Sequence, residues 1–461
     1  MPAVQGPVTG GKGATVLGPG GFDLATVGYQ QEEYFISGDA TSYVADGALA
    51  SDGNWTVSKG TTAPYTTRVV VRRPTDPAKF NGTVFVEWLN VSGGLDASPD
   101  WTYAHVELIR EGAAWVGVSA QQVGIVGGGN ALGAALALKN ADPERYAALS
   151  HPGDDYSYDI YSQTGSAVWA EPDRLLGDLK PERVLAIGES QSAFRLSTYV
   201  NAVAPTAGVY NGYLIHSRGA VGAALTAGAQ MPDPTLTRTD LDVPVLNFSS
   251  ETDLVAKGLG YARARQPDTD RFRGWEVPGT AHADAYNLGI GDGDDGSGAA
   301  DATLFAAMQD PPASVYGGVI TCGTPINTGP HTYVLRSAVR ALDQWVRTGE
   351  APPSMPQVEL AADGSIARDA QGLALGGIRT PQVDVPVAAL SGVGQTGSNF
   401  CGLFGTTVPF STAQLQAAQS THDQFVTAWT ASLDAAVTTG AVQAPDASNL
   451  RTVVQQSSVL R

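Results

Sequence analysis

The sequence predicts an α/β protein with an open, mostly parallel sheet flanked by helices. Three observations support this fold class. Short runs that are apolar throughout recur along the chain, as expected for strands covered on both faces. Segments with helical spacing separate these runs, which is typical of parallel strands joined by crossover helices. The composition also allows a large buried core, because 43% of the 461 residues are hydrophobic and 16% are charged.

We expect the chain to form one domain over residues 1–461. Residues 1–65 are rich in Gly, Ser and Thr with scattered aromatic residues, and predict a strand-rich addition of short strands and turns. Residues 66–300 carry the strand–helix alternation and predict the core. Within the core, residues 121–182 form a long connection that we interpret as a cap-like insertion. Residues 301–461 predict a helical and irregular addition that covers the core.

The core strands are predicted from apolar, often β-branched runs that end at turn residues. In chain order these runs are residues 67–71, 83–89, 114–120, 183–187, 212–216, 243–248 and 274–277. Helical composition or spacing predicts helices at residues 102–111, 131–138, 163–176, 192–203, 333–348 and 413–437. Residues 350–410 are rich in Pro and Gly and predict irregular structure.

The charge pattern excludes several classes of partner. The formal net charge is −18 and no cluster of Lys and Arg is present, which argues against nucleic acid or an anionic membrane surface as partner. No apolar run approaches the roughly 18 residues that a membrane span requires. The chain begins without the basic and apolar segments of a signal peptide. The expected partner is a small molecule, and the sequence does not predict an oligomeric state.

The chain has two cysteines, Cys322 and Cys401. They are too far apart in the sequence for a CxxC redox pair or for a thiolate zinc site. They are either two unrelated buried thiols or one disulfide. A disulfide would favour a secreted or periplasmic location over a cytoplasmic one.

The most informative stretch is GESQS at residues 188–192. A buried strand ends at Gly188 and a helix begins next to Ser190, and such a turn exposes a serine Oγ when the residues two before and two after it are small. Ser192 stands where glycine is usual. The helix N-terminus favours a nucleophile here, and the Gln191 N–H is a candidate oxyanion donor. Alone, the turn could equally have Ser190 as a helix cap.

A serine nucleophile needs an acid and a histidine, which follow it in that order in this kind of fold. Asp253 follows the strand predicted at 243–248 and is the preferred acid, with Glu251 in the same loop as the alternative. His282 directly follows the strand predicted at 274–277, unlike the other histidines after Asp253. We therefore predict His282 as the general base.

The second oxyanion donor should come from the loop after an earlier strand. Residues 90–94 (NVSGG) follow the strand predicted at 83–89, and their glycines allow close backbone approach to a ligand. The backbone N–H of Val91 or Ser92 is the predicted donor, and Asn90 belongs to the same candidate substrate-binding segment.

Two further patterns are weaker. Residues 127–133 nearly match the dinucleotide fingerprint, but Leu132 stands where its last glycine is required. Residues 292–298 (DGDDGSG) resemble a calcium loop, but an EF-hand needs a ligand where Gly296 stands, so we interpret them as a solvated acidic loop. We expect neither a metal nor an organic cofactor.

The same motifs resemble the α/β-hydrolases, and more narrowly the bacterial family named "alpha/beta hydrolase domain" proteins. The resemblance covers about residues 25–410, and GESQS is the usual nucleophile elbow of that family. It is carried by residues 63–68, 72–74, 80–83, 86–93, 115–121, 188–192, 376–381 and 385–388. It implies the α/β-hydrolase fold and a serine hydrolase of carboxylic esters, without naming a substrate.

The predicted function is a serine esterase that forms an acyl-serine intermediate. His282 removes the proton from Ser190, and Asp253 or Glu251 orients the histidine. A serine nucleophile, where epoxide hydrolases and dehalogenases use aspartate, disfavours both of those classes. Thioesterases, lactonases, amidases and acyltransferases share the acyl-serine intermediate and remain alternatives, as does a non-catalytic binding module on the same fold.

Overall fold

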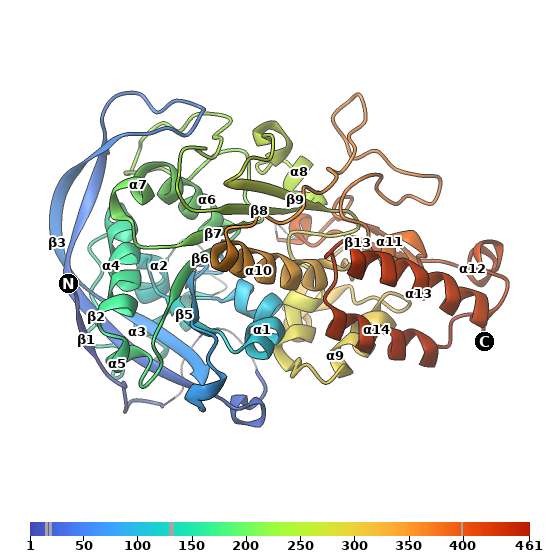
Figure 1. Cartoon of the computed structure of the whole chain (residues 1–461), viewed down its shortest axis with the longest axis horizontal. Coiled ribbons are helices and arrows are strands. Elements are labelled where there is room, and N and C mark those ends of the chain that lie inside the picture. Colours follow the sequence, from blue (N-terminus) through green and yellow to red (C-terminus); the bar gives the residue numbers. More distant parts are fainter. Residues whose placement is uncertain (14–16, 18–20, 129–132, 398–399) are drawn as a thin grey trace.

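The computed structural model of the chain describes residues 1–461 except 14–16, 18–20, 129–132 and 398–399. In this part of the chain the main sheet has nine strands in the order β1-β2-β3-β5-β4-β6-β7-β8-β9 (Figure 1). They are β1 (Ala3–Gln5), β2 (Tyr29–Ala45), β3 (Val57–Pro74), β4 (Thr83–Trp88), β5 (Ala114–Val118), β6 (Arg183–Glu189), β7 (Gly212–His216), β8 (Val245–Ser250) and β9 (Phe272–Val277). Strands β4 to β9 pair in parallel and β1 to β3 pair antiparallel, which confirms the predicted mostly parallel sheet.

Helices connect and cover these strands. The α-helices are α1 (Pro99–Glu111), α2 (Gln122–Val126), α3 (Leu138–Ala141), α4 (Ser157–Ala170), α5 (Pro172–Leu175), α6 (Gln191–Thr198), α7 (Ala204–Ala207), α8 (Glu251–Val255), α9 (Ala299–Ala307), α10 (His331–Thr348), α11 (Pro381–Asp384), α12 (Thr412–Ala418), α13 (His422–Thr438) and α14 (Ala444–Gln456). Two small antiparallel hairpins pair β10 (Ser314–Val315) with β11 (Ile320–Thr321) and β12 (Ala388–Ser391) with β13 (Thr406–Pro409). None of the helices in the described part is long and apolar enough to cross a membrane.

The parallel strands are apolar throughout because a hydrophobic core lies on each face of the sheet. In β4, Phe85 packs into the core that includes α1, α10 and α13, whereas Val84 and Val86 pack into the core that includes α4 and α6. This alternation follows from the two-residue period of a strand. In Figure 1, α1 and α10 lie to the right of the central strands β5 and β6, and α4 lies to their left.

The N-terminal region differs from the prediction of short strands. Strands β2 and β3 form one long hairpin whose pairing runs from Tyr29 opposite Pro74 to Ala45 opposite Val57. It forms the curved ribbon at the left of Figure 1. The outer part of β3, residues 57–63, is largely exposed and polar, so the sequence lacks the apolar signal that marks the buried run at residues 67–71.

The C-terminal region also differs from the prediction. The single helix predicted at 413–437 is two helices, α12 and α13, because Thr421 caps α13 through its side chain, which accepts from the Gln424 N–H. Helix α14 was not predicted, and the region expected to be irregular contains α11 and the β12–β13 hairpin. The helix predicted at 131–138 lies partly outside the described residues.

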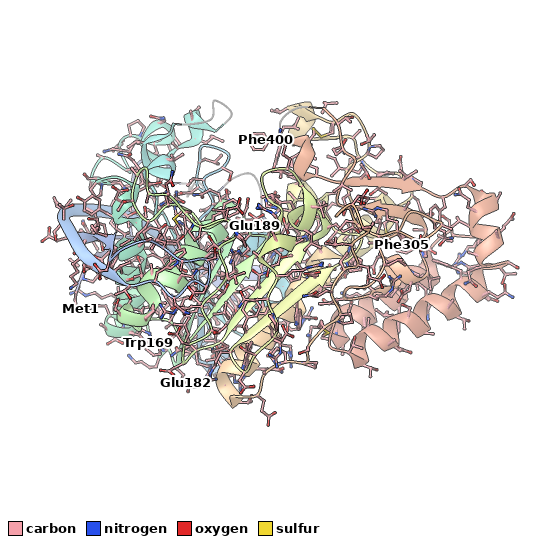
Figure 2. The ribbon with its side chains drawn as sticks, turned by 90° about the horizontal axis from the view of Figure 1, so that it is seen from above. Met1, Trp169, Glu182, Glu189, Phe305 and Phe400 are labelled. Carbon is pink, nitrogen blue, oxygen red and sulfur yellow. A yellow bond between two sulfur atoms is a disulfide. The ribbon has the colours of Figure 1, made fainter. Side chains whose placement is uncertain are left out.

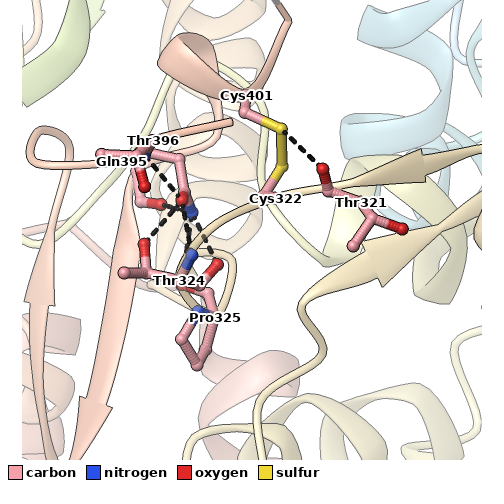
Figure 3. Close-up of a disulfide and its surroundings, with 8 residues drawn as sticks. Thr321, Cys322, Thr324, Pro325, Gln395, Thr396 and Cys401 are labelled. Carbon is pink, nitrogen blue, oxygen red and sulfur yellow. Dashed lines mark hydrogen bonds between the residues drawn. A yellow bond between two sulfur atoms is a disulfide. The ribbon is translucent and has the colours of Figure 1, made fainter. Parts of the chain in front are cut away.

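Cys322 and Cys401 form a disulfide, which decides between the two alternatives left open by the sequence (Figure 3). Their separation of 79 residues means that the bond closes a long loop. Beside it, the Gln395 side chain donates to the carbonyl oxygens of Thr324 (2.9 Å) and Gly405 (2.7 Å). The disulfide and the amide together hold the segment after β11 against the turn that precedes β13.

Candidate active site

Ser190 lies in the tight turn between β6 and α6. Its backbone has φ = 59°, a left-handed conformation that is strained for a residue other than glycine. The turn is held by the Ser190 N–H, which donates to the His216 carbonyl (3.0 Å). A Cβ atom on Gly188 would lie 3.2 Å from Cβ of Ser192, so the strand and the helix approach as closely as the sequence pattern predicts.

A continuous hydrogen-bond chain runs from Ser190 through His282 to Asp253. Oγ of Ser190 lies 2.7 Å from Nε2 of His282, and Nδ1 of His282 lies 2.6 Å from Oδ1 of Asp253. Because an ionised carboxylate only accepts hydrogen bonds, Nδ1–H donates to Asp253, and neutral His282 accepts from the Ser190 hydroxyl at Nε2. His282 and Asp253 are both buried.

The position of Asp253 follows from a capping interaction at the start of α8. The N–H and the hydroxyl of Ser250 both donate to Oδ2 of Asp253, at 2.7 and 2.8 Å, and the Asp253 N–H donates back to the Ser250 oxygen. This capping box turns the carboxylate back toward the strand end and leaves Oδ1 for His282.

Glu251 does not contact His282. One carboxylate oxygen accepts from the Gly279 N–H (2.6 Å), and the other accepts from the Gly392 N–H (3.0 Å) and from Arg368 (2.7 Å). The Glu251 side chain is fully buried. Its contact with Gly279 fixes the turn that leads to His282.

Glu189 also faces His282, although no motif in the sequence singles it out. Oε1 of Glu189 lies 3.4 Å from Nε2 of His282, and Oε2 accepts from Nδ2 of Asn90 (3.2 Å). The side chain is buried, and this burial raises the pKa of Glu189 to about 8. A charged residue at the end of an otherwise apolar strand was the signal that could have identified it.

The surrounding charges reverse the effect of burial on His282. Burial alone would lower the pKa of the imidazole, but the Asp253 carboxylate and then Glu189 raise it to about 9. Burial also opposes ionisation of Asp253, yet His282 and the bonds from Ser250 hold the pKa of Asp253 below its ordinary value. The Asp253 carboxylate therefore favours the imidazolium form of His282, and Glu189 adds to this effect when it is ionised, above its own raised pKa.

The loop after β4 lies beside Ser190, as the sequence predicts. Asn90 fastens it, because Nδ2 donates to the Glu189 carbonyl (3.1 Å) while Oδ1 accepts from the Ser92 N–H (2.8 Å). The Ser92 N–H is thereby occupied, which leaves the Val91 N–H as the remaining one of the two donors that the sequence predicts. The Gln191 N–H belongs to the first turn of α6, where the helix provides no acceptor for it.

A cavity of about 740 Å³ adjoins Ser190 and His282. Figure 2 shows Glu189 at the end of the central strands and Phe400 on the same side of the molecule. Most of the lining side chains are apolar, and they come from several separate segments. The apolar members are Leu17, Leu95, Ala97, Pro99, Leu136, Ala283, Leu288, Tyr316, Val319, Ile320, Phe400, Leu403 and Phe404.

The acidic segment at 292–298 is solvated only in part, because Asp295 and Ser297 are exposed whereas Asp294 is buried. Asp294 is buried, and its Oδ2 atom accepts from Arg336 (2.6 Å) and from the Tyr286 hydroxyl (2.7 Å). Asp292 lines the cavity. The glycine-rich near-match at 127–133 lies partly outside the described residues.

The chain belongs to the family described as "Alpha/beta hydrolase domain", whose model matches residues 4–452. This confirms the family resemblance and the α/β-hydrolase fold. None of the curated proteins matches the chain.

Several solved structures resemble the chain at low sequence identity. A serine hydrolase without a lid from Xanthomonas campestris is 12% identical over 53% of this chain and 86% of that chain, with a TM-score of 0.30. A putative dienelactone hydrolase from Klebsiella pneumoniae is 13% identical over 53% of this chain and 85% of that chain, with a TM-score of 0.28. A structure from a study of two fungal esterases of Rhizomucor miehei is 12% identical over 52% of this chain and 74% of that chain, with a TM-score of 0.27.

Proposed function

We propose that this protein is a serine hydrolase that cleaves carboxylic esters through an acyl-serine intermediate. The observation that carries the proposal is the hydrogen-bond chain from Ser190 to His282 to Asp253, which begins at a strained strand–helix turn. Nucleophile, base and orienting acid lie in hydrogen-bond contact in the order that this chemistry requires. The adjoining cavity provides space for an ester.

In the proposed mechanism, His282 takes the proton of Ser190 as Oγ attacks the ester carbonyl. The N–H groups of Gln191 and Val91 stabilise the oxyanion of the tetrahedral intermediate. His282 then protonates the leaving alcohol, and a water molecule attacks the acyl-serine with His282 again as base. Asp253 keeps the proton on Nδ1 and stabilises the imidazolium throughout. In this role, the tight turn between β6 and α6 that carries Ser190 is a nucleophile elbow.

Labelling with a fluorophosphonate tests the nucleophile directly. The intact protein should gain one covalent adduct, and a peptide map should place it on Ser190, because only an activated serine reacts readily with such a probe. Ser92→Ala is a matched control, since Ser92 lines the same cavity but does not contact His282. The control should label as the wild type does. An adduct at any other residue would contradict the proposal.

The pH dependence of kcat/KM should reflect the charges around His282. The base must be neutral to act, and its pKa is raised, so activity should fall as the pH drops and the acidic limb should lie above 6.5, the ordinary pKa of histidine. The Glu189 carboxylate lies 3.4 Å from Nε2 and raises the pKa of His282 when it is ionised, so Glu189→Gln should move this limb to lower pH by about one pH unit.

The control for this shift is Glu251→Gln. It also removes a buried carboxylate, but one that bonds Gly279, Gly392 and Arg368, so the acidic limb should stay in place. Identical pH profiles for Glu189→Gln and the wild type would show that Glu189 exerts no charge effect on His282.

The disulfide between Cys322 and Cys401 supports a secreted or periplasmic location, because disulfides form and persist in oxidising compartments.

A further inference from the structure

We infer that the substrate is an uncharged ester with a large apolar group, which extends from Ser190 along the cavity to an apolar rim formed by Leu136, Tyr316 and Val319. This inference rests on the proposed ester hydrolysis and adds the chemical class of the substrate. It is carried by the lining of the cavity, by the exposure of the rim and by the placement of charge.

The inner wall of the cavity is suited to a hydrocarbon group. Leu288 packs with Leu403 and Phe404 in a small hydrophobic cluster beside His282, and all three line the cavity. The volume of about 740 Å³ lies within the roughly 300–1,000 Å³ typical of sites for organic ligands. An acetyl group would leave most of this apolar wall in contact with water.

The rim continues this apolar wall to the outside of the molecule. Leu136 is 47% exposed, Tyr316 43% and Val319 66%, and all three line the cavity. Single exposed apolar residues need no explanation, but a group of them around one cavity indicates a binding surface. An apolar substrate group that reaches the rim would cover them, and this burial would contribute to binding.

The charges near Ser190 disfavour an anionic substrate. The acidic residues of the described lining are Glu189 and Asp292, and this part of the lining contains no Lys or Arg. A carboxylate on the substrate would meet two acidic side chains in a largely apolar cavity, with no Lys or Arg of the described lining to pair with it.

The disulfide holds the two segments that form one side of this wall. Cys322 follows closely after Val319 and Ile320, and Cys401 lies between Phe400 and Leu403. The carbonyl of Leu403 also accepts from the N–H of Ala283, the residue after His282 (3.1 Å). The apolar wall is therefore fixed relative to the histidine before a substrate arrives, which reduces the entropy lost on binding.

A series of p-nitrophenyl esters tests the class of substrate with the full chain. We expect kcat/KM to rise at least about tenfold from acetate to octanoate, since each buried methylene contributes roughly 0.8 kcal/mol. The half ester of the eight-carbon diacid suberic acid has the same chain length with a terminal carboxylate. Its kcat/KM should be at least about tenfold below that of the octanoate.

The variant Val319→Asp tests the rim. Val319 is largely exposed and outside the core, so the change should leave the fold intact, and it should lower kcat/KM for the octanoate by about tenfold more than for the acetate. The matched control is Val408→Asp, because Val408 on β13 is 57% exposed and does not belong to the described lining. The control should leave both esters unchanged.

The outcomes separate this inference from the proposed function. Three outcomes would overturn the substrate class and leave the proposed hydrolase activity intact. The first is turnover of the acetate with no gain for the octanoate, and the second is equal turnover of the octanoate and the suberate half ester. The third is an equal loss of kcat/KM for both chain lengths in Val319→Asp. Failure of the wild type to turn over any ester, with no fluorophosphonate adduct at Ser190, would instead overturn the proposed function.

Discussion

Replacing Ser190 with alanine should lower kcat for p-nitrophenyl acetate by about 10⁵–10⁶-fold, because it removes the atom that forms the acyl intermediate. The loss should appear in kcat and in kcat/KM alike. Alanine meets the same steric cost as serine at φ = 59°, and the Ser190 N–H that holds the turn is retained, so thermal unfolding should be little changed. Initial rates and thermal unfolding curves of both proteins measure these two effects.

The control is Ser92→Ala, which removes another hydroxyl from the same cavity. The contacts that fasten this loop use the backbone N–H of Ser92 and the side chain of Asn90, and alanine preserves both. Its kcat should therefore stay within about tenfold of the wild type. Hydrolysis by Ser190→Ala at more than about a hundredth of the normal rate would contradict the nucleophile assignment.

The features that could be predicted from the sequence depend on local patterns. The turn around Ser190 follows from an apolar strand, a small residue at 188 and helix-forming residues after 190, all within a few positions of one another. The strands of the parallel sheet were found because cores on both faces make their sequences apolar throughout.

The features that could not be predicted depend on contacts between distant segments. The sequence places Glu251 and Asp253 in one short loop and favours Asp253, but it does not show what Glu251 contacts. The partner that buries Glu251 is Arg368, 117 residues further along the chain. The sequence predicts only short strands where the long β2–β3 hairpin lies, because the exposed outer end of the hairpin has no apolar pattern.

The difference between these two acids leads to the second large expected effect. Asp253→Asn should lower kcat by about 10⁴-fold, because an amide facing His282 no longer holds the proton on Nδ1 or stabilises the imidazolium. Glu251→Gln should leave kcat within about tenfold of the wild type. It should instead destabilise the fold by about 3 kcal/mol, since it leaves Arg368 without its buried partner. Steady-state kinetics and urea unfolding of both variants separate the two roles.

Both substitutions replace a carboxylate by the amide of the same shape, and the two sites are two residues apart in α8. A general sensitivity of this helix would therefore reduce both activity and stability in both variants. Opposite losses, of turnover in Asp253→Asn and of stability in Glu251→Gln, can arise only when one carboxylate serves His282 and the other serves the fold. A drop in kcat for Glu251→Gln as large as that for Asp253→Asn would contradict this division.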